Sequence, residues 1–303
     1  MYIAQCLRSV IGQSYRCIEA IVIDDGSSDS TQRIVSELAR RDGRIRLIPQ
    51  VNLGVSAARN RGIIAARGDY VFFLDADDWL EPNAIEKLVQ CASESDADIV
   101  CLRATFHYGT GDVLPQTFPG GISCADVESY GPVLCGMPTF TWNYFYKRSV
   151  VGSHRYDPEV SYAEDCLFIF QVADDSCRYG FVDEPLYNYR VARSGSALAS
   201  ITPDGSRSIK QIKGLILTRG KELGCYENAA VQYGSASFGL LRKTARNKAF
   251  YYQNCSETAE NIAILLATRS ARSMLYALAC KMPRLMRPLF IMLGMQSRTM
   301  RIR

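Results

Sequence analysis

The sequence lacks the residue patterns that build compact metal or disulfide sites. It has only two histidines, His107 and His154, and none of its 11 cysteines forms a Cys-x-x-Cys pair. A metal site made from these residues is therefore not expected. The odd cysteine count and the apolar sequence around Cys6, Cys91 and Cys101 indicate reduced thiols, as is usual in a cytosolic protein.

Acidic residues are absent after Glu260, although the chain as a whole is nearly balanced. Its 303 residues include 35 Lys and Arg against 31 Asp and Glu, which gives a net charge of +4. Eight basic residues follow Glu260, so the preceding part carries 27 basic against 31 acidic side chains, a balance of −4. We expect these two parts of the chain to face different partners.

Long apolar runs are also absent, and a helix that spans a bilayer needs about 20 mostly apolar residues. Between residues 271 and 295 apolar side chains are frequent, but Lys281, Arg284 and Arg287 interrupt them, and two prolines are expected to break the helix. Two interpretations remain open: a segment that lies on an anionic membrane surface, or a helix that caps the domain with a solvated basic face. No nucleic-acid partner is expected, because no binding motif accompanies the charge.

The N-terminal part alternates short apolar segments with amphipathic ones. Residues 1–13 predict a helix rather than a signal peptide, because their apolar side chains recur on one helical face. Strands are then expected at 18–23, 44–49, 70–74 and 98–102, with helices around Val35, at 56–66 and at 82–91. This alternation indicates an α/β fold with a mostly parallel sheet flanked by helices. Strand signals stop near residue 204, so we predict one domain over 1–204 and a helical C-terminal region over 205–303.

Two groups of aspartates lie at the ends of predicted strands. Asp24 and Asp25 end the first strand, and Asp75, Asp77 and Asp78 end the third. In parallel sheets ligands bind beyond the carboxyl ends of the strands. A single group can be explained as helix caps, but two groups at one edge repel each other unless a cation or hydrogen-bond donors compensate. The Asp-x-Asp spacing of Asp75 and Asp77 suits Mg²⁺ or Mn²⁺, which prefer hard oxygen ligands.

Aromatic residues are concentrated in one short stretch. It contains Phe140, Trp142, Tyr144, Phe145 and Tyr146. We interpret these side chains as core residues, because aromatic rings bury large apolar areas. A surface that binds flat rings is the alternative.

Three motifs occur in order along the first 80 residues. They are Ile23–Thr31 (IDDGSSDST), Asn52–Gly62 (NLGVSAARNRG) and Phe72–Asp78 (FFLDADD). In this order and at these intervals they resemble the signature of the family 2 glycosyltransferases, which have the GT-A fold with a Rossmann-like nucleotide-binding half. Further matches extend the resemblance over about residues 2 to 195, at Trp142–Ser149, Tyr162–Asp165 and Tyr187–Arg190.

The resemblance implies a site for a nucleotide-diphosphate sugar, in the first place a uridine-linked one. Asp25, with Asp24 beside it, matches the aspartate that reads the base, and a carboxylate can accept the uracil imide proton. Arg59 matches a basic residue near the base, with Asn60 next to it. Asp75 matches the first acid of the Asp-x-Asp motif, which is associated with the ribose and with metal-bound water.

The resemblance also implies a metal-dependent, inverting transfer. Asp77, together with Asp75, matches the ligands of Mn²⁺ or Mg²⁺, and the ion would neutralise the departing diphosphate. Asp165 matches the general base that takes the proton from the acceptor hydroxyl. Without the other motifs, Glu164 and Asp165 would be interpreted as the acidic first turn of a helix.

A basic segment follows the last predicted strand. It contains Arg190, Arg193 and Ser194. With Glu164, the two arginines are candidates for a loop that contacts the acceptor or the diphosphate, because arginine binds phosphate through bidentate contacts. Solvated surface charge explains the same residues equally well.

By resemblance, the expected process is the synthesis of a cell-surface polysaccharide. The acceptor would be a glycan or a lipid-linked saccharide, as in bacterial capsule, exopolysaccharide or cell-wall assembly. The expected location is cytoplasmic, with the basic tail holding the protein at the inner face of the plasma membrane.

One departure from the family pattern bears on this function. Family members begin with a buried strand that ends in a Pro-x-Tyr-Asn-like sequence, whereas Met1–Ala4 already matches the helix after it. Neighbouring strands would then lack a partner, and the donor site would be incomplete. A start assigned too far downstream and a truncated, catalytically impaired binding or scaffold protein both fit this departure. A nucleotidyltransferase fits less well, because no Gly-rich basic phosphate loop is present near the N-terminus.

Overall fold

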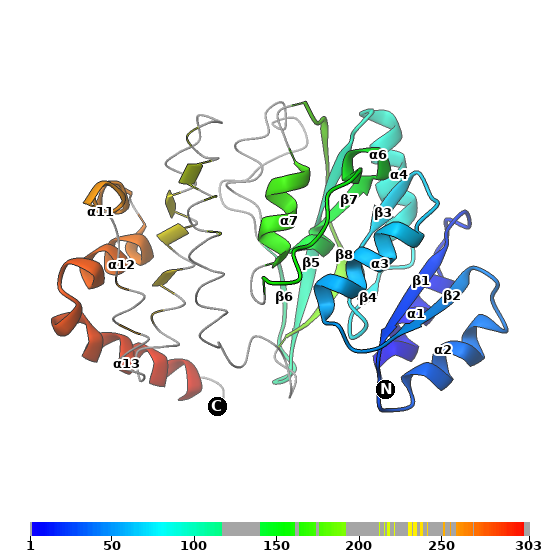
Figure 1. Cartoon of the computed structure of the whole chain (residues 1–303), viewed down its shortest axis with the longest axis horizontal. Coiled ribbons are helices and arrows are strands. Elements are labelled where there is room, and N and C mark those ends of the chain that lie inside the picture. Colours follow the sequence, from blue (N-terminus) through cyan, green and yellow to red (C-terminus); the bar gives the residue numbers. More distant parts are fainter. Residues whose placement is uncertain are drawn as a thin grey trace. The chain divides into compact units, whose positions relative to one another are not determined.

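The protein forms two compact units, Met1–Ser194 and Gly195–Arg303. The sequence pattern placed this division after residue 204. The structure, a computed structural model, describes residues 2–116, 140–160, 164–173, 176–191, 259–268 and 270–299, together with isolated positions from 212 to 255. In Figure 1 the N-terminal unit runs from blue to green, and the last helices of the C-terminal unit are orange and red.

The N-terminal unit contains every helix and strand that the sequence predicted there, with shifted ends. In chain order its first elements are α1 (Tyr2–Ile11), β1 (Ala20–Asp25), α2 (Thr31–Ala39), β2 (Ile45–Gln50), α3 (Val55–Ala65), β3 (Tyr70–Phe72), β4 (Trp79–Leu80), α4 (Ala84–Glu94) and β5 (Ile99–Tyr108). They are followed by β6 (Val113–Pro115), the 3-10 helix η2 (Thr141–Asn143), β7 (Tyr144–Lys147), α6 (Arg148–Val151), α7 (Glu164–Val172) and β8 (Tyr179–Val191).

The strands form a two-stranded parallel sheet and a larger mixed sheet. β1 and β2 pair in parallel, and the other six strands form a second sheet in the order β3-β7-β5-β8-β4, with β6 on β5. In the described part of that sheet only β5 and β8 are parallel, and the other four ladders are antiparallel. The α/β class is confirmed, but the expectation of a mostly parallel sheet was wrong. Parallel neighbours need a crossover connection, whereas β6 returns along β5 after a short turn.

Among the described residues, β1 pairs with β2 alone and β3 pairs with β7 alone. Each of these two strands therefore has one edge without a strand partner in the described part of the chain. Among the described residues the two sheets are connected by packed helices and not by strand pairing. α3 packs against β1, while α1 contacts both α2 and β4.

Helix α1 confirms the apolar face expected for residues 1–13. Its Ile3 and Leu7 side chains are buried with Val35 of α2 and Ile45 of β2 in a small core. Because α1 also contacts β4, this core ties the two-stranded sheet to the larger one.

The larger sheet is covered on both faces. Alternate side chains of a strand point to opposite faces, and along β7 Phe145 enters the core shared with α4, whereas Tyr146 packs against Phe168 of α7. Phe73, next to β3, contacts Tyr146, Tyr156 and Phe168 edge to face. The aromatic-rich stretch is therefore core, as predicted, with Trp142, Tyr144, Phe145 and Tyr146 all buried.

The C-terminal unit includes α11 (Ala259–Ala267), α12 (Ala271–Lys281) and α13 (Pro283–Thr299). Pro283 begins α13, where the missing proline N–H has no intrahelical partner to lose. The helix continues through Pro288, so the break expected there was wrong. Pro288 is exposed, and the backbone carbonyl that loses its partner can bind water. Among the described helices, none combines the length and the apolar character that crossing a bilayer requires.

Candidate active site

Asp25, the last residue of β1, holds the loop that follows β2. Its Oδ1 accepts hydrogen bonds from Nε2 of Gln50 at 2.7 Å and from the N–H of Leu53 at 2.8 Å, and Oδ2 accepts from the N–H of Gly54 at 2.9 Å. Burial raises the pKa of Asp25, but these hydrogen bonds outweigh it and lower the pKa below its ordinary value. Since a carboxylate has about four lone-pair positions, Asp25 keeps room for one further donor.

Asp24 and Gly26 shape the turn at the same strand end. Asp24 is buried, and its Oδ1 accepts a hydrogen bond from the N–H of Ser27 at 3.2 Å. Gly26 has a φ of +75°, and a Cβ at this position would lie 2.9 Å from the backbone nitrogen of Asn52. The turn therefore requires glycine. The predicted role of Asp24 beside the base stays a prediction.

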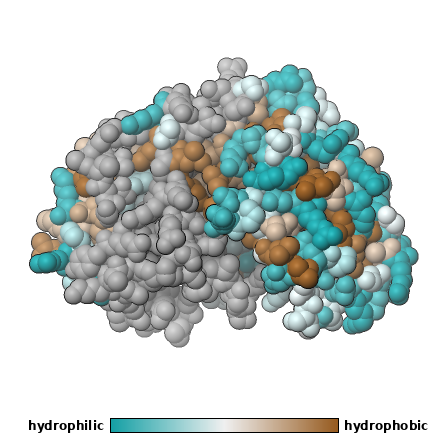
Figure 2. Space-filling model, viewed as in Figure 1, coloured by the Kyte–Doolittle hydropathy of each residue, from teal (hydrophilic) through white to brown (hydrophobic). Residues whose placement is uncertain are grey.

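The loop held by Asp25 exposes apolar side chains. Val51, Leu53 and Val55 are all solvent-exposed. On the face of the N-terminal unit seen in Figure 2, hydrophobic residues lie in small groups among hydrophilic ones. The loop thus offers apolar surface next to a hydrogen-bond acceptor, a combination that suits a flat heterocyclic base.

The Asp-x-Asp loop after β3 is anchored to β8. The hydroxyl of Tyr187 accepts a hydrogen bond from the N–H of Asp75 at 3.2 Å and donates one to Oδ2 of Asp78 at 2.7 Å. The N–H of Arg190 donates to Oδ1 of Asp78 at 2.8 Å. Burial raises the pKa of Asp78 to about 7 in spite of these two hydrogen bonds. Asp78 is therefore an internal anchor of the loop, whereas the Asp75 side chain is 36% exposed.

Arg190 packs against the same loop. Its Nε donates to the backbone oxygen of Asp77 at 3.0 Å, and Nη2 donates to Oε1 of Gln5 at 3.0 Å. The guanidinium lies 4.7 Å from the ring centroid of Tyr2 and 4.8 Å from that of Trp79, distances typical of cation–π contacts. In this structure Arg190 supports the backbone of Asp77, and its predicted contact with a diphosphate stays a prediction.

Arg59 of α3 connects three carboxylates from two distant parts of the chain. Its Nη2 lies 3.3 Å from Oδ1 of Asp75, its Nη1 lies 3.0 Å from Oε1 of Glu164, and Nη1 also pairs with Oδ1 of Asp165. The guanidinium carbon is 5.2 Å from the ring centroid of Tyr156. Burial lowers the pKa of Arg59, but the charges of Asp165 and Asp75 outweigh it and raise the pKa. Arg59 therefore stays protonated.

Asp165 lies in the first turn of α7, next to η2. Its Oδ1 pairs with Arg59, and its Oδ2 accepts a hydrogen bond from the N–H of Thr141 at 3.3 Å. Burial raises the pKa of Asp165 to about 6; Arg59 lowers it, while the charges of Glu164 and Asp75 raise it. The Arg59 guanidinium and the Thr141 N–H thus hold the Asp165 carboxylate at the start of α7, and its predicted role as general base stays a prediction.

Asn60, the neighbour of Arg59, fixes the segment that leads to α7. Its Nδ2 donates to the carbonyl oxygen of Tyr156 at 2.8 Å, and its Oδ1 accepts from the N–H of Tyr156 at 2.7 Å. Both ends of the Asn60 amide thus bind the backbone of Tyr156, which lies 96 residues later in the chain. The predicted contact between Asn60 and the donor stays a prediction.

The structure brings four predicted site residues into one cluster around a guanidinium: Arg59, Asp75, Glu164 and Asp165. Arg193 lies outside the described residues. Four residues of the site were not among those assigned a role from the sequence: Asp78, Thr141, Tyr156 and Tyr187. Asp78 and Tyr187 lie within the matched motifs, but nothing in the sequence around either residue indicates that they contact each other.

Asp75 and Asp77 are the residues of this loop that would hold a divalent cation; the Asp75 side chain is 36% exposed, and Asp77 is 9% exposed. In the part of the chain that the structure describes, no group of three or more His, Cys, Asp or Glu side chains is arranged to hold a metal ion. Mg²⁺ and similar ions are usually held by one or two carboxylates together with water and substrate phosphates. A cation held by these two aspartates would take its remaining ligands from water and a bound diphosphate, and the predicted metal site stays a prediction.

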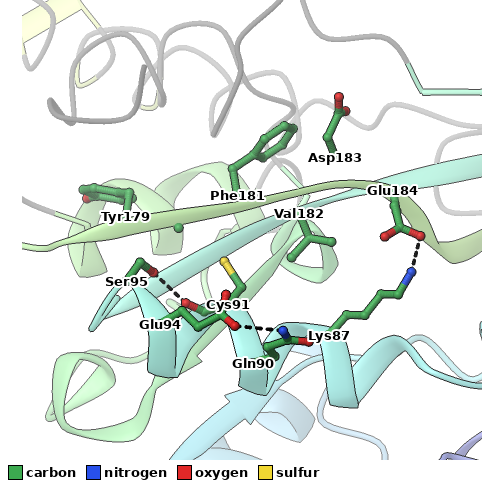
Figure 3. A pocket seen from close by; sticks show the side chains of 11 residues that line it. Lys87, Gln90, Cys91, Glu94, Ser95, Tyr179, Phe181, Val182, Asp183 and Glu184 are labelled. Carbon is green, nitrogen blue, oxygen red and sulfur yellow. Dashed lines mark hydrogen bonds and ion pairs between the residues drawn. The ribbon is translucent and has the colours of Figure 1, made fainter. Parts of the chain in front are cut away.

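A separate groove lies between α4 and β8. It has a volume of about 490 Å³ and contains none of the predicted site residues. Figure 3 shows Lys87 paired with Glu184 across it and Gln90 bonded to Glu94 along α4. Gly180 lets the strand approach the helix, because a Cβ there would lie 2.8 Å from Sγ of Cys91.

Comparison with known proteins identifies relatives of the N-terminal unit. Residues 1–141 match the glycosyl transferase family 2. The glycosyltransferase EpsH of Bacillus subtilis is 34% identical over 196 residues, which cover 63% of this chain and 57% of EpsH. The minor teichoic acid biosynthesis protein GgaB of Bacillus subtilis is 29% identical over 203 residues, which cover 65% of this chain and 22% of GgaB. The chain thus spans little more than half the length of EpsH.

The solved structure of S. aureus TarS residues 1–349 in complex with UDP-GlcNAc is similar in fold. The TM-score is 0.67, and the match covers 95% of this chain and 82% of TarS 1–349 at 18% sequence identity. At this identity the similarity shows the fold, in which a mixed sheet is flanked by helices.

Proposed function

We propose that this chain, whose N-terminal unit belongs to glycosyl transferase family 2 and has the GT-A fold, transfers a sugar from a nucleotide-diphosphate sugar to a saccharide acceptor in cell-surface polysaccharide synthesis. One observation supports this function most directly. The guanidinium of Arg59 pairs with both Asp75 of the Asp-x-Asp loop and Asp165 at the start of α7. The loop proposed to bind the donor and the carboxylate proposed as the base are therefore adjacent.

The donor is proposed to be a uridine-diphosphate sugar. Asp25 has room for one more hydrogen-bond donor, and the uracil imide N–H would fill it. The exposed side chains of Val51 and Leu53 supply apolar surface beside that carboxylate. TarS, which has the same fold, binds UDP-GlcNAc in its crystal structure.

Asp75 and Asp77 are proposed to hold Mn²⁺ or Mg²⁺. The ion would supply neutralisation of the diphosphate charge that develops as the donor bond breaks. The protein contributes a fixed loop, because Tyr187 binds the backbone of Asp75 and Arg190 binds the backbone of Asp77.

Asp165 is proposed as the general base of an inverting transfer. As the acceptor oxygen bonds to the anomeric carbon, its proton passes to the Asp165 carboxylate, and the bond from that carbon to the diphosphate breaks on the opposite face. A positioned base of this kind contributes about 10²–10⁴-fold to the rate. The acceptor is proposed to be a glycan or a lipid-linked saccharide, in keeping with the teichoic acid role in the name of GgaB.

The C-terminal unit is proposed to hold the enzyme on an anionic membrane surface, at the inner face of the plasma membrane. Leu285, Leu289 and Met292 recur at helical spacing along α13, and Leu285 is 73% exposed. Lys281 and Arg284 are exposed next to them. Apolar side chains beside basic ones, with no acidic residue after Glu260, are typical of a segment that binds an anionic interface.

Release of UDP tests the proposed function. Purified protein with Mn²⁺ is incubated with a panel of UDP-sugars, with and without saccharide acceptors. Release of UDP from at least one donor, together with calorimetric binding of UDP, is the expected result. Absence of both would favour the alternative, a catalytically impaired binding or scaffold protein.

A further inference from the structure

We propose that Arg59 is a positioning residue for the general base: its guanidinium holds the Asp165 carboxylate in place beside the Asp-x-Asp loop. This inference rests on the proposed function, because it assigns Arg59 a role in the same transfer. It differs from the role predicted from the sequence, in which Arg59 lies near the base of the nucleotide.

Arg59 links α7 to the Asp-x-Asp loop through its two terminal nitrogens. Nη1 binds Glu164 and Asp165 on α7, and Nη2 binds Asp75 on the loop after β3. Glu164 and Asp165 are 105 and 106 residues away in sequence, so nothing local holds α7 and α3 together at this point. A planar guanidinium can bind several carboxylate oxygens in fixed directions, which a lysine ammonium cannot do.

Arg59 is enclosed rather than presented to a ligand. Its side chain is 12% exposed, and one face of the guanidinium is covered by the ring of Tyr156. The neighbouring Asn60 binds the backbone of Tyr156 through both ends of its amide. A nucleotide base that bound Arg59 would compete with its carboxylate partners and with the Tyr156 ring for the guanidinium.

Arg59 also balances charge. Three carboxylates surround this one cation, and without it Asp75, Glu164 and Asp165 would repel one another in a site of low exposure. Asp165 is 14% exposed, and its other oxygen is held only weakly, by the Thr141 N–H at 3.3 Å. Loss of Arg59 would therefore leave the base free to rotate away from the acceptor.

A double-mutant cycle tests the proposal. The variants are Arg59→Ala, Asp165→Asn and the two combined, and the readouts are kcat and KM for the UDP-sugar that the wild type turns over fastest, with the Kd of UDP measured by calorimetry. Arg33→Ala is the control, because Arg33 also pairs with a carboxylate, Glu37, but on the exposed face of α2.

Positioning predicts a split between kcat and binding. Arg59→Ala should lower kcat at least about 10-fold, while KM for the donor and Kd for UDP change less than about 2-fold. In the Asp165→Asn background, removal of Arg59 should change kcat less than about 2-fold, because Arg59 acts through Asp165. Arg33→Ala should match the wild type.

A nucleotide-contact role predicts the reverse. A UDP Kd raised at least about 10-fold with kcat unchanged, or additive effects in the cycle, would overturn the proposal. If Arg59→Ala does not fold, Arg59→Lys is used in its place, because lysine keeps the positive charge but lacks the planar guanidinium that binds several carboxylate oxygens. A Lys variant with wild-type kcat would equally overturn it. A wild type that releases no UDP from any donor would contradict the proposed function itself, a failure distinct from additivity in an active enzyme.

Discussion

The hydroxyl of Tyr187 donates a 2.7 Å hydrogen bond to Oδ2 of Asp78 and accepts one from the N–H of Asp75 at 3.2 Å. One buried oxygen on β8 thus joins both ends of the Asp-x-Asp loop, more than 100 residues earlier in the sequence. The position of Asp77 between these two ends depends on this pair of contacts.

Tyr187→Phe should therefore destabilise the protein. It removes the hydrogen bond to Oδ2 of the buried Asp78 carboxyl, whose Oδ1 keeps the Arg190 N–H, and it removes the acceptor of the Asp75 N–H; losing such bonds costs about 1–3 kcal/mol. Urea unfolding measures this loss, and Tyr108→Phe, at an exposed tyrosine of β5, is the matched control and should change the unfolding free energy by less than about 0.5 kcal/mol. Equal stability of Tyr187→Phe and the wild type would show that the hydroxyl does not anchor the loop.

Turnover should rise with pH through about 6. Asp165 accepts a proton only when ionised, and burial raises its pKa to about 6. Below that pH the protonated carboxyl cannot act as a base, so kcat should rise roughly 10-fold from pH 5 to pH 7. The profile is measured as UDP release at saturating Mn²⁺ and donor. A flat or falling profile over this range would remove Asp165 from the base role.

Chelation should abolish turnover. EDTA removes the divalent ion proposed at Asp75 and Asp77, and added Mn²⁺ should restore UDP release. Asp77→Asn should need at least about 10-fold more Mn²⁺ for half-maximal rate, because one charged ligand is lost. Asp112→Asn, at an exposed aspartate in the turn before β6, is the control. Full activity in EDTA would contradict the metal assignment.

Charge reversal on the C-terminal unit should release the protein from anionic vesicles. Each basic side chain near such a surface contributes about 1 kcal/mol, so Lys281→Glu with Arg284→Glu should weaken binding to phosphatidylglycerol vesicles at least about 10-fold. Sedimentation with vesicles measures this. Arg33→Glu on α2 with Arg40→Glu directly after it makes the same change of net charge on the N-terminal unit and should bind as the wild type does. An equal loss of vesicle binding in both double variants would show that binding depends on the net charge of the protein and not on a docking surface of the C-terminal unit.

The sequence predicted the features that depend on local pattern. The helices and strands of the first half, the buried face of α1 and the position of Asp75 and Asp77 at a strand end all follow from the spacing of apolar and acidic residues. These features reflect contacts within one turn or between successive elements, so a short stretch of chain contains the information.

Other features depend on partners far apart in the chain. The antiparallel pairing of β7 with β3 and β5 and the pairing of Asn60 with Tyr156 leave no local pattern. Arg59 was assigned to the donor base because it lies in the second motif, whereas its observed partners Glu164 and Asp165 lie more than 100 residues later. Proline usually ends or kinks a helix, but α13 continues through Pro288. The backbone carbonyl that loses the proline N–H as a partner is exposed and can bind water instead.

The central claim is that Asp165 performs base catalysis at a working donor site, and Asp165→Asn tests it most directly. Asparagine keeps the size of the side chain but cannot take up the proton. The account predicts UDP binding within about 2-fold of the wild type and UDP release from the preferred donor lowered by about 10²–10⁴-fold. UDP release by Asp165→Asn at the wild-type rate would contradict it.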